Sequence, residues 1–212
     1  AREVDTYMGA DETVYHQLDA AMTTEFTGYD GAPVVDAKVI ALVANNAIAD
    51  SASAGDEVSV FLDRTPFYAE SGGQIGDNGT IKTDMGTVEV TDCIKVIGGK
   101  ITHIGTVTEG SISVGDTAVA EIDRVKRLST SRNHSATHLL QKALRTVLGT
   151  HVEQAGSYVT PDRLRFDFTH FAAMTAEEIQ QVEDIVNEKI LESIPVTVSQ
   201  ESIENARKLG AM

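Results

Sequence analysis

The sequence predicts an α+β protein in which a small antiparallel β-barrel is followed by helices packed on an antiparallel sheet. Two observations carry this prediction. From residue 34 to about 123, apolar and polar residues alternate with period two, and glycine-containing pairs separate the runs at the spacing of short strands. After residue 124, the pattern changes to that of amphipathic helices. We therefore expect a connector over residues 1–30, the barrel over 31–125 and the second domain over 126–212.

The barrel region contains short alternating runs with turn residues between them. Before it, residues 1–30 show only a weak helical rhythm, which the turn residues 28–31 end. Gly55-Asp56 and Gly115-Asp116 each precede an alternating run that ends in an aspartate, which indicates repeated turn geometry rather than a repeat protein. A compact antiparallel barrel is the expected architecture. The clearest strands are expected over residues 39–43, 57–62, 86–90 and 101–104.

The second half begins with a strong amphipathic helix, predicted over residues 129–148 and ended by Gly149. Thr175 and Glu178 form a capping box, which predicts the start of another long helix. The remaining predicted elements are strands over 158–159 and 164–168 joined by a turn, a helix reaching about 194, a strand over 195–198 and a helix over 201–209.

Composition excludes several classes of protein. The 212 residues are 42% hydrophobic and 23% charged, as in globular proteins. No apolar run approaches the roughly 20 residues that a membrane span needs, so we expect no membrane partner. The single cysteine, Cys93, excludes an internal disulfide framework and a zinc site made of cysteines alone. This cysteine usage fits a reducing compartment and predicts a cytoplasmic location.

The charge is unevenly distributed. A net charge of −15 argues against a nucleic-acid partner, because phosphate binding needs a basic face. Residues 124–152, however, contain six Lys or Arg and no Asp or Glu, so they carry +6 and leave −21 for the rest of the chain. This segment would suit a phosphodiester substrate, although it could equally be a linker whose basic side chains pair with acidic neighbours.

His134 and His138 lie four residues apart on the first predicted helix, so both imidazoles lie on one face, where they could share a metal ion. The alternative is a pair of ordinary surface histidines. The apolar stripe runs along another side of this helix, so neither histidine is expected to pack in the core. Two ligands are too few for zinc, and His151, His170, a carboxylate or ligands beyond residue 212 would have to complete the site.

The loop over residues 65–77 combines aromatic residues with three glycines. The glycines permit close approach of backbones or positive φ angles, or the loop is merely a wide barrel turn. It lacks the Gly-Lys-Ser/Thr ending of a phosphate-binding P-loop, and the chain has no Gly-x-Ser-x-Gly nucleophile elbow.

Four segments together resemble the alanyl-tRNA synthetase family: residues 65–77, 132–140, 151–157 and 164–170. The similarity is to the editing region, which that family shares with free-standing AlaX-type editing proteins. It implies a β-barrel followed by an α+β editing domain that hydrolyses mischarged tRNA. The opening 25 residues resemble, less distinctively, the connector that follows the family's ATP- and Mg-dependent aminoacylation domain.

The resemblance also implies roles for individual residues. Gly72 and Gly73 match the family's glycine motif beside the editing cleft, and His134 and His138 match its first two zinc ligands. The other two zinc ligands come from a later Cys-Gly-Gly-Thr-His-type motif, which does not occur in this sequence. The remaining candidates are Gln154 and Thr137 for catalysis, and Lys126, Arg127 and Arg132 for the phosphates of the tRNA acceptor end.

The implied reaction is hydrolysis of the ester between serine or glycine and alanine tRNA. The implied partners are that tRNA and the remaining domains of the same synthetase. Two alternatives stay open: an inactive module that contacts tRNA or joins domains, and a free-standing AlaX-type protein. Since the final predicted helix is closed by Gly210 where a native chain would normally continue, we expect a fragment whose editing domain is incomplete at its C-terminal end.

Overall fold

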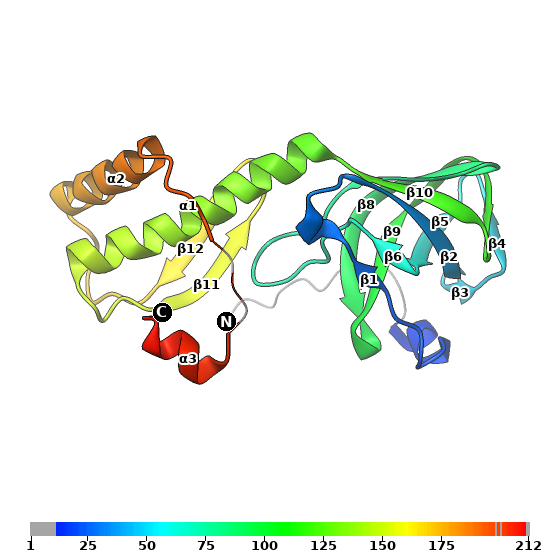
Figure 1. Cartoon of the computed structure of the whole chain (residues 1–212), viewed down its shortest axis with the longest axis horizontal. Coiled ribbons are helices and arrows are strands. Elements are labelled where there is room, and N and C mark those ends of the chain that lie inside the picture. The colour runs from blue at the N-terminus through cyan, green and yellow to red at the C-terminus, as the bar shows by residue number, and fades with distance from the viewer. Residues whose placement is uncertain (1–11, 198, 200, 211–212) are drawn as a thin grey trace.

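The computed structural model describes residues 12–197, 199 and 201–210. Six strands of the first half close into an antiparallel barrel, in the order β10-β7-β8-β9-β5-β2, with β10 pairing back onto β2 (Figure 1). Closure leaves no free edge on these strands, so their backbone groups pair with one another. The predicted barrel is confirmed. Its strands are β2 (Val34–Ala44), β5 (Glu57–Leu62), β7 (Gly79–Thr83), β8 (Gly86–Val96), β9 (Lys100–Ser113) and β10 (Thr117–Ile122).

The barrel is filled by the apolar residues of the period-two pattern. In β10, for example, Ala118, Ala120 and Ile122 are buried while the residues between them are exposed. Phe67, Leu42 and the other inward residues form one continuous core. Shorter elements lie around the barrel: η1 (Glu12–Gln17), β1 (Glu25–Phe26), η2 (Gly28–Asp30), β3 (Ala47–Ile48), β4 (Ser51–Ser53), β6 (Arg64–Thr65) and η3 (Ile97–Gly99).

The repeated Gly-Asp turns have the same geometry. Gly55 and Gly115 have φ angles of 98° and 97°. In both turns, the following aspartate side chain accepts a 2.8 Å hydrogen bond from the backbone N–H of the serine three residues before it. The structure thus confirms the predicted turn repeat.

Helix α1 (Arg124–Leu148) runs from the end of the barrel across the second half of the chain (Figure 1). It begins at Arg124 rather than at the predicted residue 129. The start was missed because residues 124–128 are mostly exposed and add no apolar stripe. Asp123 caps this end by accepting a hydrogen bond from the Lys126 backbone N–H, and Gly149 ends the helix as predicted.

In the second half, α1 packs against α2 (Ala176–Leu191) and against a hairpin of β11 (Gln154–Val159) and β12 (Leu164–Phe168). The buried centre of this half consists of Ala143 and Leu144 of α1, Val182 of α2, and Val152 of the segment between α1 and β11. Thr175 and Glu178 make both hydrogen bonds of the predicted capping box. The hairpin and the two helices confirm the α+β prediction for this half.

Several other predicted elements differ from the structure, among them the strand predicted over 158–159, which extends over Gln154–Val159. The rhythm near residue 14 becomes the short 3-10 helix η1, and α2 ends at Leu191 rather than near residue 194, just before Ser193 with its φ of 50°. The strand predicted over 195–198 is wrong for residues 195–197, which are irregular, and residue 198 lies outside the described residues. Val196 there is 78% exposed, and a lone short segment gains little from an extended conformation.

The last element, α3 (Ile203–Lys208), is shorter than predicted. Within the described part of the chain, no helix is both long and apolar enough to cross a bilayer.

Candidate functional site

The imidazoles of His134 and His138 stack on one face of α1, with ring centroids 5.4 Å apart and planes 23° apart. His134 is half-buried and His138 is exposed, and neither belongs to the core around Leu144. Burial, and secondarily the nearby His138, lowers the pKa of His134. A lowered pKa favours the neutral ring, which is the form that binds metal ions and accepts protons.

A tight turn of the barrel loop lies against this face. Ser71 and Gln74 exchange backbone hydrogen bonds of 3.0 and 3.2 Å, and Gly72 and Gly73 between them have φ angles of 60° and 83°. Positive φ at both central residues is the pattern of a type I′ turn, which glycine adopts without strain. The glycine motif expected from the resemblance is therefore a turn that needs its two glycines.

The same turn is bonded to strand β11. The Val159 N–H donates to the Gly73 carbonyl at 2.7 Å, and the Ile75 N–H donates to the Val159 carbonyl at 3.2 Å. A Cβ at Gly73 would lie 2.5 Å from the Ser157 carbonyl oxygen, which is closer than real Cβ atoms approach. Glycine is required here for close packing as well as for its φ angle.

Gln74 joins the turn to the histidine pair. Its side-chain oxygen Oε1 lies 2.6 Å from His134 Nδ1, and the residue is only 6% exposed. Gln74 was not among the site residues predicted from the sequence. The one feature of the sequence that could have indicated it is its position directly after Gly72-Gly73, because a tight turn fixes the direction in which the chain leaves it.

Gln154 lies on β11 next to the turn, whereas the Thr137 hydroxyl faces its own helix. The exposed Gln154 donates to the Ser157 hydroxyl at 3.2 Å, and that hydroxyl donates to the Gly72 carbonyl at 3.4 Å. Thr137 is buried and donates to the Asn133 carbonyl at 2.8 Å. The catalytic roles of both residues stay predictions.

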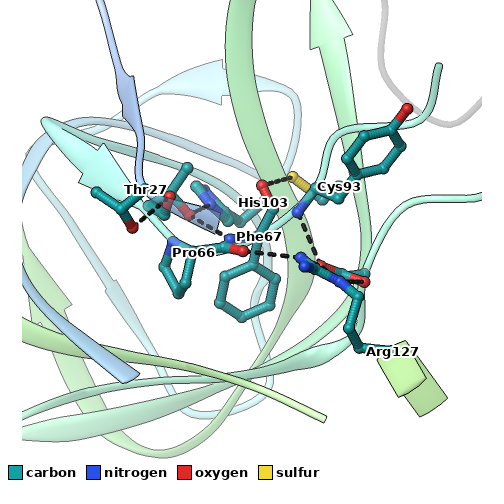
Figure 2. Close-up of polar contacts among 9 residues, drawn as sticks. Thr27, Pro66, Phe67, Cys93, His103 and Arg127 are labelled. Atoms are coloured by element: carbon teal, nitrogen blue, oxygen red, sulfur yellow. Dashed lines mark hydrogen bonds and ion pairs between the residues drawn. The ribbon is translucent and has the colours of Figure 1, made fainter. Parts of the chain in front are cut away.

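The three basic residues predicted to contact tRNA have different surroundings. Lys126 and Arg132 are exposed; Lys126 pairs with Asp123 at 4.0 Å, and Arg132 donates to the Ser129 hydroxyl at 2.8 Å on the same segment. Arg127 is instead held inside the protein, where it pairs with a carboxylate that is 6% exposed, that of Asp77, and donates to the Pro66 carbonyl at 2.9 Å (Figure 2). Its guanidinium therefore joins α1 to the barrel loop.

A family model for class II (A) tRNA synthetases matches residues 2–126 of the chain. The chain belongs to this family. It is 54% identical to an alanine–tRNA ligase of Acetivibrio thermocellus over 94% of its length, and 50% identical to alanine–tRNA ligase 1 of Lachnoclostridium phytofermentans over 100% of its length. An alanine–tRNA ligase of Bacillus velezensis is 48% identical over 92% of the chain. These matches confirm the resemblance to alanyl-tRNA synthetases that the motifs predicted.

This synthetase chain spans about a quarter of the length of those relatives, covering 23%, 24% and 22% of them. The match of the family model extends through the barrel and stops within the first turn of α1. It therefore includes the glycine turn but neither histidine of the pair.

The two histidines on α1 are of a residue type that binds zinc, but two ligands are fewer than a zinc site needs. Gln74 Oε1 can only accept, so His134 Nδ1 carries the hydrogen and Nε2 keeps the lone pair that a metal needs. No group of three potential ligands comes together within the described residues. His151 and His170 form a separate pair, with ring nitrogens 2.9 Å apart. His134 and His138 thus fit two positions of a zinc site that needs further ligands.

Proposed function

We propose that this chain carries the editing region of an alanyl-tRNA synthetase, which hydrolyses alanine tRNA mischarged with serine or glycine. The observation that carries the proposal is the stacked pair His134 and His138 beside the glycine turn, in a chain about half identical to alanine–tRNA ligases. Selection by binding alone discriminates weakly among small side chains, so such ligases benefit from a hydrolytic second step.

In the proposed reaction, water adds to the ester carbonyl and the bond from that carbon to the ribose 3′ oxygen breaks. The products are the free amino acid and tRNA with its 3′ hydroxyl restored. Gln154, exposed beside the glycine turn, would hydrogen-bond the aminoacyl group, and Thr137 is the other candidate for this pocket. The exposed side chains of Lys126 and Arg132 would meet the phosphates of the acceptor end.

His134 and His138 would hold zinc together with further ligands. Zinc bound there would supply Lewis acidity toward the ester carbonyl or the attacking water. Independently of the metal, burial lowers the pKa of His134 and so favours the neutral ring, and the contact with Gln74 orients the ring toward the turn. An editing reaction on tRNA would also place the protein in the cytoplasm.

The test is deacylation of seryl- and glycyl-tRNA(Ala), measured for this chain and for the chain extended at its C-terminal end to the length of its relatives. We expect the extended protein to release serine or glycine faster than alanine. The H134A variant should lose this activity, whereas H16A, which removes an exposed histidine of η1, should keep it.

The two forms distinguish the proposal from its alternatives. An extended protein that binds tRNA and zinc but leaves both esters intact would contradict the editing proposal and identify a tRNA-contacting module. Activity of the extended form alone would show that ligands outside this chain complete the site.

A further inference from the structure

The side chain of Gln74 crosses from the barrel to helix α1. Its carboxamide oxygen and His134 Nδ1 lie 2.6 Å apart, between residues separated by 60 positions in the chain. Gln74 is 6% exposed, so water competes little for this contact. A buried polar side chain that bonds across two parts of a fold is well placed to determine the orientation of its partner.

The chemistry of this contact determines which nitrogen of His134 carries hydrogen. A carboxamide oxygen has lone pairs and no hydrogen, so it can only accept. His134 must therefore donate from Nδ1, and in the neutral ring the lone pair then belongs to Nε2. A neutral imidazole without such a partner exchanges between both tautomers.

The backbone holds Gln74 in place from both sides. Before it, the Gly73 carbonyl accepts from the Val159 N–H, and after it, the Ile75 N–H donates to the Val159 carbonyl. The residue itself closes the Gly72-Gly73 turn through its two backbone bonds with Ser71. Few backbone rotations are left to Gln74, so its side chain starts from a defined position.

These contacts also explain why the turn is so close to β11. An alanine at position 73 would clash with the Ser157 backbone, so the turn that carries Gln74 would have to shift. The paired glycines thus bring Gln74, rather than only the backbone, to the histidine pair. A wide barrel turn without a further role would need neither the close contact of Gly73 with Ser157 nor a buried side-chain carboxamide at Gln74.

We propose that Gln74 is a positioning residue that holds His134 as the Nδ1–H tautomer and thereby presents Nε2 as its ligating nitrogen. The role in ligation rests on the proposed function, whereas the tautomer is a property of the chain itself. Partners that orient a ligating histidine in this way typically contribute 10- to 100-fold to metal affinity.

The first test is independent of activity and of metal. Long-range ¹H–¹⁵N correlation spectra of the histidine-labelled chain report the tautomer of each ring. We expect His134 as the Nδ1–H form in the native chain. Q74M, which keeps a long side chain but has no strong acceptor, should shift His134 toward the Nε2–H form. Q74E, which restores an acceptor, should return it, and Q180A should change nothing, because Gln180 is an exposed glutamine of α2.

The second test uses Zn²⁺ alone, titrated while the His134 and His138 resonances are observed, so that other histidines do not contribute. We expect Q74M to weaken binding at this pair by about 10- to 100-fold and Q74E to recover most of it. Thermal unfolding of each variant verifies that the barrel remains folded.

The outcomes separate this proposal from the editing proposal. If Q74M leaves both the tautomer and the Zn²⁺ affinity unchanged, Gln74 does not position His134, even where the extended protein deacylates seryl-tRNA. If the tautomer and affinity change as expected but neither form of the native protein deacylates, the positioning role stands and the editing function fails.

Discussion

Arg127 of α1 and Asp77 of the barrel loop form a buried ion pair with two nitrogens on one carboxylate. Arg127 Nε lies 2.9 and 2.8 Å from the two Asp77 oxygens, and its side chain is 17% exposed. The Asp77 carboxylate also accepts from the Tyr68 backbone N–H at 2.8 Å. The loop that carries the glycine turn is thus connected to α1 at its far end as well as at Gln74.

Removing Arg127 should destabilise the protein. In R127A, Asp77 would keep a buried charge without its cation, and loss of one partner of a buried pair costs roughly 3 kcal/mol of unfolding free energy. Urea denaturation measures this loss. R132A is the matched control, because Arg132 is exposed and donates to the Ser129 hydroxyl on its own helix, and the stability of this variant should stay within about 0.5 kcal/mol of native. Equal unfolding free energies of R127A and R132A would show that the Arg127–Asp77 pair does not stabilise the protein.

The same three cations should differ in their effect on tRNA binding. K126A and R132A should each weaken binding of alanine tRNA and make the slope of log K against log salt less negative by about 0.8, since each removes one proposed phosphate contact. R127A should leave this slope unchanged, because Arg127 is already paired with Asp77. Filter binding at several salt concentrations tests this, under conditions where R127A is folded. If R127A changed the slope as much as K126A does, the prediction that Arg127 makes no contact with tRNA phosphates would be wrong.

Alanine should be tolerated far better at Gly72 than at Gly73. Both positions have positive φ, so each substitution costs roughly 1 kcal/mol in backbone strain. A Cβ at Gly72 meets open space, whereas one at Gly73 meets the Ser157 backbone and would add about 1–3 kcal/mol. Hydrogen exchange at the Val159 amide, which donates to Gly73, measures the local effect. Faster exchange in G73A than in G72A is expected, and equal rates would contradict the close packing.

His103 should make stability fall on acidification. It is fully buried and lies beside Phe67 (Figure 2). Its Nδ1 donates to the Val60 carbonyl at 2.8 Å, and its Nε2 accepts from the Thr65 hydroxyl at 2.7 Å. Burial lowers its pKa from 6.5 to about 4. Between these values the unfolded chain binds a proton that the folded chain does not, so stability is lost as pH falls through this window.

The loss from His103 amounts to about 3 kcal/mol between pH 6.5 and 4. Unfolding free energies measured across this range for the native chain and H103Q isolate it, because the carboxylates contribute equally to both. The variant should be less stable at pH 7 and lose less stability on acidification. Parallel curves would show that His103 is protonated in the folded state as readily as in the unfolded state.

The sequence predicted elements whose cause is local. The barrel strands follow from alternation, and α2 begins where Thr175 and Glu178 form a capping box. The start of α1 was missed because Asp123 alone marks it, and the supposed strand at residues 195–197 has suitable residue types but no neighbouring strand among the described residues.

In the candidate site, too, the features with a local cause could be predicted and those that depend on distant contacts could not. The spacing of His134 and His138 on a helix is a local property, so their position on one face could be predicted, and the structure shows the two rings stacked there. The contacts of Gln74 and Arg127 join segments 60 and 50 residues apart, and neither appears in any local pattern. Arg127 was predicted as a tRNA contact because charge in a sequence does not show its partner, and that role has no support from its buried pair with Asp77.

The bonds between the glycine turn and Val159 have a consequence for dissection of the protein. They occupy the N–H and C=O of Val159 on β11, opposite to its pairing with β12. A fragment that begins after Asp123 would contain the second half without the barrel. In this fragment the backbone N–H and C=O of Val159 would be exposed on an unpaired edge of the sheet. Such edges pair with other chains, so the isolated half should self-associate unless the barrel is retained. The barrel would then protect the edge of β11 at Val159 from pairing with another chain.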